Sequence, residues 1–132
     1  MKNVNFLIAF ILLFSKNLFA QYSTDWIRPS ETYQKNGVMI ARDNYDNVIS
    51  TGYLTANNTF THKYNKFGVL QWEAVSASGI PSQYEKPVWV TTDNNNNVFV
   101  AGYQYGGSNT PIGMIVLKYS PDGVQLWKQV IN

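Results

Sequence analysis

Short runs of apolar, β-branched and aromatic residues alternate with clusters of Asn, Asp, Gly and Pro along most of the chain. Such runs are typical of β-strands, and no window of helical length carries a sustained apolar stripe at helical spacing. The expected strands are residues 38–41, 48–53, 60–64, 69–75, 88–91, 98–103, 114–119 and 124–130. The pattern therefore predicts an all-β chain made of two four-stranded antiparallel meanders.

The two halves of the chain repeat each other. Residues 37–53 align with 87–103 at an offset of 50, and residues 60–75 align with 115–130 at an offset of 55. Thirteen of these 33 paired positions are identical, including the Gly-Tyr, Lys-Tyr and Gly-Val-x-x-Trp matches. A period of about 50 residues predicts a repeat architecture with one meander in each repeat.

The turn residues recur at fixed places in the repeat. Asp43 and Asp93 each begin an Asp-Asn-x-x-Asn segment between the first two strands, where Asp and Asn tolerate positive φ and bond to their own backbone. Gly68 and Gly123 lie between the last two strands, where a hairpin bulge requires a left-handed residue. The alternating oxygen side chains after Asp93 also occur in calcium loops, but no Gly and no bidentate Glu complete such a loop. We therefore expect hairpin turns and no metal site.

The first 20 residues have the layout of a secretory signal peptide. Lys2 precedes an unbroken apolar run at 6–14, and Ala20 precedes a polar stretch. The apolar run is too short for a membrane-spanning helix, which needs about 20 residues, and we expect cleavage after Ala20. The remaining 112 residues carry eight basic and eight acidic side chains, and the chain has no cysteine. The sequence therefore predicts no binding to nucleic acid, no insertion into a membrane after cleavage and no disulfides.

The repeated motifs resemble the β-propeller repeats of secreted bacterial proteins, in which D-x-x-x-N-V…G-Y precedes K-Y-x-x-x-G-V-x-x-W. The residues that carry the resemblance include Asp43, Gly52, Tyr53, Gly68 and Trp72, and again Asp93, Gly102, Tyr103, Gly123 and Trp127. The resemblance covers most of residues 22–132 and implies one four-stranded blade per repeat, arranged radially beside its neighbours. It also implies a secreted or cell-surface protein, exported through the inner membrane of a Gram-negative bacterium.

Trp26 aligns with Trp72 and Trp127, so the segment after the leader is expected to supply a lone outermost strand. The expected organisation is a signal peptide at 1–20, an outer strand and linker at 21–36, a first blade at 37–75, an inter-blade loop at 76–86 and a second blade at 87–132. We expect the three tryptophans to pack between blades, because a large aromatic side chain recurs once per repeat at one register. Trp89 lies on a first strand and is expected to line the wall of a central channel.

The antiparallel strand order predicts that connections of fixed length lie at one end of the blades and connections of variable length at the other. The variable connections are residues 54–59 against 104–113, and 29–37 against 76–87. In repeat proteins such variation collects on the face used for binding. Tyr84, Tyr105 and Asn109 are therefore predicted to border a surface that recognises a protein or a carbohydrate.

No catalytic motif accompanies these features. His62 is the only histidine and aligns with Leu117 inside an expected strand. One histidine and no cysteine exclude the common zinc sites and thiol chemistry, and no nucleophile elbow or phosphate loop occurs. We expect no catalytic residue, no cofactor and no bound metal.

Two blades are fewer than the roughly four to eight that close a propeller. Either the chain is the first part of a longer propeller, which the sequence favours, or several copies assemble into a closed ring. The predicted function is that of a secreted, non-catalytic interaction module. The alternatives are a carbohydrate-binding lectin that closes a propeller by oligomerising, and the N-terminal fragment of a propeller enzyme.

Overall fold

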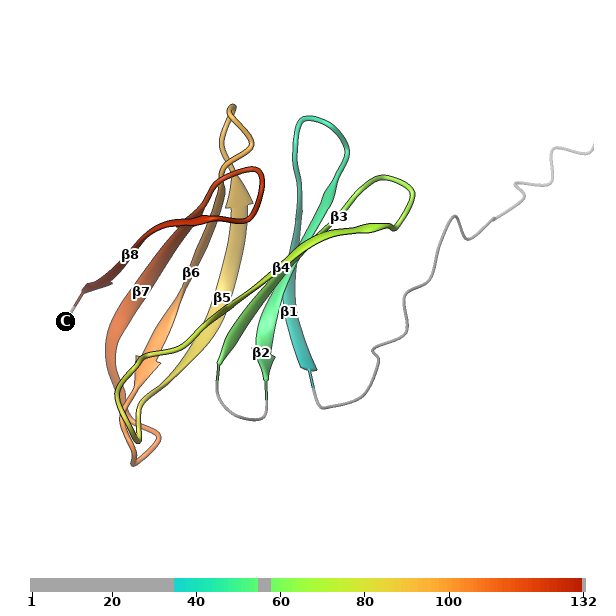
Figure 1. Ribbon diagram of the computed structural model, residues 1–132. Coiled ribbons are helices and arrows are strands. Elements are labelled where there is room, and N and C mark those ends of the chain that lie inside the picture. The colour runs from blue at the N-terminus through green and yellow to red at the C-terminus, as the bar shows by residue number, and fades with distance from the viewer. Residues whose placement is uncertain (1–34, 55–57, 132) are drawn as a thin grey trace, which may run out of the picture.

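The computed structural model describes residues 35–54 and 58–131, which form two four-stranded antiparallel sheets (Figure 1). The first sheet contains β1 (Lys35–Arg42), β2 (Val48–Leu54), β3 (Thr59–Tyr64) and β4 (Leu70–Ser76). The second sheet contains β5 (Tyr84–Thr92), β6 (Val98–Tyr105), β7 (Pro111–Tyr119) and β8 (Gln125–Ile131). In both sheets the strands are neighbours in chain order, which confirms the prediction of an all-β chain with two antiparallel meanders.

No helix occurs among the described residues, so none of them belongs to an apolar helix that could cross a membrane. Several expectations fall on residues outside those that the structure describes. They are the signal peptide at 1–20, the part of the outer strand and linker that covers residues 21–34, and the packing of Trp26.

The two sheets share the same irregularities at equivalent positions of the repeat. Register shifts occur at Gly37/Met39 and Pro87/Trp89, and again at Lys63/Tyr64 and Lys118/Tyr119. Gly52 lies opposite the first shift, and a Cβ atom there would lie 2.0 Å from the carbonyl oxygen of Asn36. A Cβ atom on Gly102 would lie 2.3 Å from the carbonyl oxygen of Lys86. The recurring Gly-Tyr pair therefore marks the point where the backbones of two neighbouring strands approach too closely for a side chain.

Two strands continue further than the sequence predicts. β6 extends to Tyr105 and β7 begins at Pro111, so the expected loop at 104–113 contains only a short turn at 106–110. Asn109 has a φ of 60° and its N–H donates to the carbonyl of Gly106 at 3.0 Å. This is the same tight closure as in the Asp turns, and it lets both strands continue into the turn. Similarly, β5 begins at Tyr84, so that only residues 77–83 separate the two sheets.

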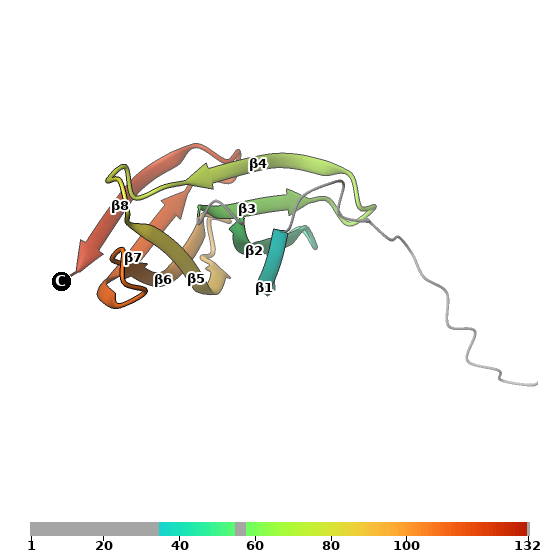
Figure 2. The same cartoon turned by 90° about the horizontal axis from the view of Figure 1, so that it is seen from below.

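The two sheets pack face to face through an apolar core. It contains Ile49, Val90, Val98, Val100, Ile115, Leu117 and Tyr119, with Met39, Ala41, Trp72, Ala74 and Val130 packed against it. β5 packs against β1 and β2 (Figure 2). By strand alternation, Ile49 and Trp72 share one face of the first sheet, whereas their repeat counterparts Phe99 and Trp127 share the face of the second sheet that points away from this core. Opposite faces of two equivalent sheets therefore meet, which means that the repeats stack in the same orientation.

The connections separate into two groups at opposite ends of the sheets (Figure 1). At one end lie the turns at 43–47, 65–69, 93–97 and 120–124, and at the other end lie the connections at 77–83 and 106–110. We call the first group the turn end and the second group the loop end.

Candidate functional site

The Asp turns use their carboxylates to close the chain on itself. Asp43 Oδ1 accepts the N–H groups of Tyr45 at 2.9 Å and Asn47 at 3.0 Å, and Asp43 Oδ2 accepts the Asn47 side-chain amide at 2.8 Å. Asp93 has the same three hydrogen bonds, from Asn95 and twice from Asn97. Their carboxylates thus satisfy backbone donors in a turn, as their position in the repeat predicts.

Left-handed residues complete the turns at this end. Asp46 and Asn96 have φ values of 63° and 60°, and Gly68 and Gly123 have φ values of 76° and 85°. Within the described residues, no three His, Cys, Asp or Glu side chains gather in a way that could hold a metal ion.

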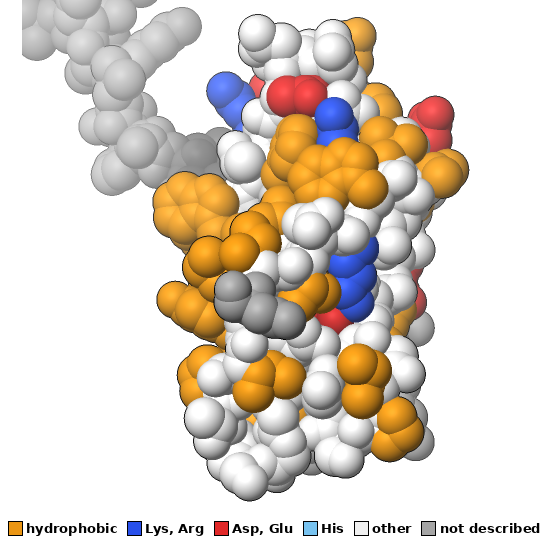
Figure 3. Space-filling model, turned by 90° about the vertical axis from the view of Figure 1, so that its left-hand side faces the viewer, with side chains coloured by type: hydrophobic (Ala, Val, Ile, Leu, Met, Phe, Trp, Pro, Cys, Tyr) orange, Lys and Arg blue, Asp and Glu red, His pale blue; other side chains and the backbone are white. Residues whose placement is uncertain are grey.

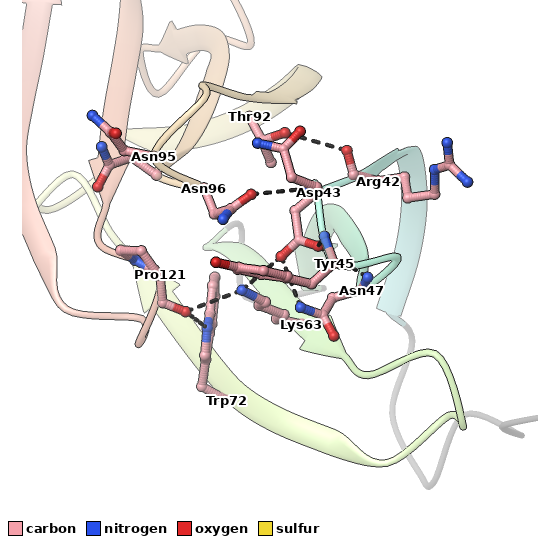
Figure 4. Close-up of polar contacts among 12 residues, drawn as sticks. Arg42, Asp43, Tyr45, Asn47, Lys63, Trp72, Thr92, Asn95, Asn96 and Pro121 are labelled. Atoms are coloured by element: carbon pink, nitrogen blue, oxygen red, sulfur yellow. Dashed lines mark hydrogen bonds and ion pairs between the residues drawn. The ribbon is translucent and has the colours of Figure 1, made fainter.

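A buried ion pair joins the first Asp turn to Lys63 on β3, and Lys63 also hydrogen bonds to the second sheet. Lys63 Nζ lies 2.9 Å from Asp43 Oδ2, and both side chains are almost fully buried. Lys63 Nζ also donates to the carbonyl of Pro121 at 3.2 Å, and the indole N–H of Trp72 donates to that same carbonyl at 2.9 Å (Figure 4). Two donors of the first sheet therefore converge on one backbone oxygen in the β7–β8 turn of the second.

The surroundings of Asp43 favour its charged form. Burial alone raises the pKa of Asp43, but the hydrogen bonds from Asn47, Lys63 and the backbone outweigh burial and hold the pKa below its ordinary value of 3.8. A charged Asp43 at neutral pH is what the buried ammonium of Lys63 requires, because an unpaired buried charge costs several kcal/mol.

The two Asp turns also bond directly to each other. The backbone N–H of Asn44 donates to Asn96 Oδ1 at 2.9 Å, and the Asn44 side chain donates to the carbonyl of Asn94 at 3.1 Å. Beside them, the Thr92 hydroxyl donates to the carbonyl of Arg42 at 3.2 Å (Figure 4). Together with Asp43, Lys63, Trp72 and Pro121, these residues form what we call the inter-sheet network. Its residues hold the two repeats in a fixed relation at the turn end.

The three residues predicted to border a binding surface lie together at the loop end. The rings of Tyr84 and Tyr105 are stacked, with centroids 5.1 Å apart and planes inclined by 6°. The Tyr84 hydroxyl contacts Asn109 Oδ1. Lys86 Nζ lies over both rings, at 5.2 Å and 5.3 Å from their centroids. We call these four residues the tyrosine cluster.

Sequence reasoning missed Lys86, and it placed Tyr84 and Tyr105 in loops rather than on strands. Tyr84 is paired with Tyr105 and Lys86 with Tyr103 in the register of β5 and β6. Residues two apart on a strand point to the same face, so the spacing of Tyr84 to Lys86 and of Tyr103 to Tyr105 could have indicated one cluster. Lys86 Nζ also lies 5.4 Å from the ring centroid of Tyr53 in the first sheet.

A second buried ion pair supports the loop end from beneath. The Glu85 side chain is fully buried and is paired with Lys128 on β8. Glu85 Oε2 also accepts the Ser76 hydroxyl at 3.1 Å, and Lys128 Nζ donates to the carbonyl of Ala77 at 2.6 Å. This pair ties the start of β5 to β8 and to the end of β4. No local sequence pattern predicts this ion pair, because Glu85 and Lys128 are 43 positions apart in the sequence.

His62 lies on the face of the first sheet that points away from the second. Its Nε2 faces Glu73, and its Nδ1 lies 3.2 Å from the Tyr64 hydroxyl. Lys35 Nζ contacts both Glu73 Oε2 at 3.0 Å and His62 Nε2 at 3.3 Å. Burial and the charge of Lys35 lower the pKa of His62 below its ordinary value of 6.5, against the opposing effect of Glu73. Both ring nitrogens of a neutral histidine thus face the protein's own side chains.

The tryptophans occupy different environments. Trp72 packs against the core between the sheets, with its ring centroid 5.9 Å from that of Tyr119. Trp127, its repeat counterpart, is 43% exposed on the outer face of the second sheet. Trp89, which was expected to line a channel, is 54% exposed on that same outer face. Trp26 lies outside the described residues.

Neither a protein-family model nor a curated protein sequence matches the chain.

Proposed function

We propose that the protein is a secreted, non-catalytic interaction module of the β-propeller type, which contacts its ligand at the loop end. The propeller assignment is supported by two four-stranded meanders that share one register and stack in the same orientation, as the blades of a propeller do. A β-sandwich formed from two related sheets by a two-fold axis would instead bring equivalent faces together.

The tyrosine cluster is the main observation that supports a binding surface at the loop end. Tyr84 and Tyr105 present two stacked rings beside the Lys86 ammonium and the Asn109 amide. Tyrosine supplies a large, rigid and amphipathic contact area at a low cost in side-chain entropy, and asparagine adds adaptable hydrogen bonding. The Glu85–Lys128 pair beneath the cluster restrains β5, so that the rings are positioned before a ligand arrives.

A carbohydrate is the second candidate ligand. Phenol hydroxyl and carboxamide groups can donate and accept hydrogen bonds side by side, and ring faces are common in the walls of small-molecule sites. This combination suits a hydroxyl-rich ligand and fits the alternative of a lectin that closes a propeller by oligomerising.

The test compares the loop end with the turn end in the exported chain. Tyr84→Ala and Tyr105→Ala alter the tyrosine cluster, while Tyr45→Ala removes a tyrosine that is 72% exposed at the opposite end. On a glycan array, binding that is lost in the two cluster variants and retained in Tyr45→Ala assigns a carbohydrate ligand.

A protein ligand is tested by photo-cross-linking at the surface of the producing cells. A photoreactive side chain placed at position 105 is expected to capture a partner that the same group at position 45 does not capture. The proposal is overturned if no glycan binding and no cross-linked product depends on the tyrosine cluster.

A further inference from the structure

The outer face of the second sheet exposes a row of large apolar side chains. By strand alternation this face carries Trp89, Phe99, Tyr103, Met114, Trp127 and Ile131. All but Phe99 are more than two-fifths exposed, and hydrophobic side chains gather over this side of the molecule in Figure 3. Patches of this kind mark sites of association in soluble proteins. We call this surface the open face.

The same face of the first sheet is already covered within the chain. Ile49, the counterpart of Phe99, is fully buried against the second sheet. Trp72, the counterpart of Trp127, packs there beside Tyr119. Within the chain, this face of the repeat is therefore covered by the opposite face of another sheet of the same kind.

The open face also carries the repeat counterparts of two donors of the inter-sheet network. Trp127 and Lys118 are the counterparts of Trp72 and Lys63, which both donate to the carbonyl of Pro121. On the open face, Lys118 Nζ lies 5.0 Å from the ring centroid of Phe99, and that ring lies 6.1 Å from the ring of Trp127. Trp127 and Lys118 thus lie close together on the open face. Their counterparts in the first sheet, Trp72 and Lys63, both donate to one carbonyl oxygen.

The first sheet carries the matching acceptor half on its own outer face. On this face Ile40 is 71% exposed near the turn end, whereas Phe60 and His62 further along the sheet are 4% and 7% exposed. Val90, the counterpart of Ile40, is 3% exposed in the core between the sheets. Lys66 occupies the turn position of Pro121, in a β3–β4 turn closed by the same hydrogen bond from its glycine. Asp46, the counterpart of the acceptor Asn96, has a side chain that is 61% exposed. One chain therefore presents a donor face at one side and an acceptor face at the other.

We propose that the open face binds a second copy of this chain, with Trp127 and Lys118 of one copy donating to the Lys66 carbonyl of the next. Such a contact is heterologous, because different surfaces of two identical chains meet, and copies can add until a ring closes. The contact repeats the interface between the two sheets of one chain. It extends the proposed function to the part of the open face around Trp127 and Lys118. Tyr103 joins this face to the tyrosine cluster, with its ring centroid 6.4 Å from that of Tyr105, so the test substitutes residues outside the cluster and measures association rather than ligand binding.

The first experiment measures the mass of the exported full-length product by light scattering and sedimentation over a range of concentrations. The wild-type chain is expected to associate, and Trp127→Ala is expected to weaken association by about 30-fold or more, as loss of a central aromatic anchor does. Lys118→Glu is expected to weaken it as well. Ile80→Ala is the control, because Ile80 is 52% exposed but lies in the loop between β4 and β5.

The second experiment distinguishes a head-to-tail contact from any other. Trp127→Ala removes the donor face and keeps the acceptor face, whereas Ile40→Glu removes the acceptor face and keeps the donor face. Each variant alone is expected to be monomeric and to melt as a folded chain, and an equal mixture is expected to form a heterodimer that grows no further. A wild-type chain that is monomeric at its highest soluble concentration overturns the proposal. So does association that both variants retain, or a mixture in which no heterodimer forms.

Discussion

The indole of Trp72 hydrogen bonds across 2.9 Å to the carbonyl of Pro121, and so connects β4 of the first sheet to a turn of the second. The same ring packs on Gly123 in that turn, where an added Cβ atom would lie 2.7 Å from two of its carbons. Trp72 therefore contacts both the backbone oxygen and the glycine of the β7–β8 turn in the second sheet.

Substitution of Gly123 by alanine is expected to be strongly destabilising. Gly123 has a φ of 85°, which costs about 1 kcal/mol for a residue with a side chain, and the new methyl group would collide with Trp72. We expect the free energy of unfolding in urea to fall by about 3 kcal/mol, because core overpacking adds about 1 to 3 kcal/mol.

Gly79→Ala is the matched control for this effect. Gly79 has a similar φ of 75° but nothing within 4 Å of an added Cβ atom. It should therefore show the cost of the backbone conformation alone, about 1 kcal/mol. Equal losses in the two variants would contradict the packing of Trp72 on Gly123.

The buried ion pair makes a different prediction for the two Asp turns. Asp43→Ala removes the turn hydrogen bonds and leaves the ammonium of Lys63 buried without its partner, and we expect a loss of about 3 to 5 kcal/mol in the free energy of unfolding. Asp93→Ala removes equivalent turn hydrogen bonds, but its repeat counterpart of Lys63 is Lys118, which lies over Phe99. The loss should be clearly smaller. Chemical denaturation of both variants measures the difference, and a reversed order would show that Lys63 does not depend on Asp43.

Acid should weaken the fold through the same carboxylate. The pKa of Asp43 in the folded chain lies below its ordinary value of 3.8, so the unfolded chain takes up a proton first as the pH falls. The stabilisation is complete well above pH 3.8 and is lost as the pH falls from that value through the folded pKa. Asp43→Asn is expected to reduce the slope of unfolding free energy against pH in this window, as measured by urea titrations between about pH 5 and pH 2. An unchanged slope would show that Asp43 does not contribute to the pH dependence of stability.

The repeat and its turns were readable from the sequence because they depend on local chemistry. Asp43, Asp93, Gly68 and Gly123 lie in the turns that Asn, Asp and Gly patterns predict, with the left-handed residues where hairpins require them. The pairing of neighbouring strands followed from the same signals.

The sequence does not indicate which copy of a repeated residue is buried between the sheets. Trp72 and Trp127 occupy the same place in the motif, yet one packs in the core and the other is exposed. The difference depends on the next sheet in space and not on neighbouring residues. For the same reason the pairing of Glu85 with Lys128 had no local signal, and polar residues around Asn109 suggested a loop where hydrogen bonds close a tight hairpin.

The repeated Lys-Tyr pair provides a last prediction, because its two tyrosines differ in their polar surroundings. Among the residues that the structure describes, no group is placed to form a well-aligned hydrogen bond with the buried hydroxyl of Tyr119. Burial raises the pKa of Tyr119 to about 12, against the opposing effect of the nearby Thr61 hydroxyl. Its counterpart Tyr64 has its hydroxyl 3.2 Å from His62 Nδ1. A buried polar group without a partner costs about 1 to 3 kcal/mol, whereas a satisfied hydrogen bond contributes about 1 kcal/mol. Tyr119→Phe should therefore raise the free energy of unfolding by about 1 kcal/mol, and Tyr64→Phe should lower it by a similar amount. Urea denaturation of the two variants at neutral pH measures both effects, and a Tyr119→Phe chain less stable than the wild type would mean that this hydroxyl has a partner in solution.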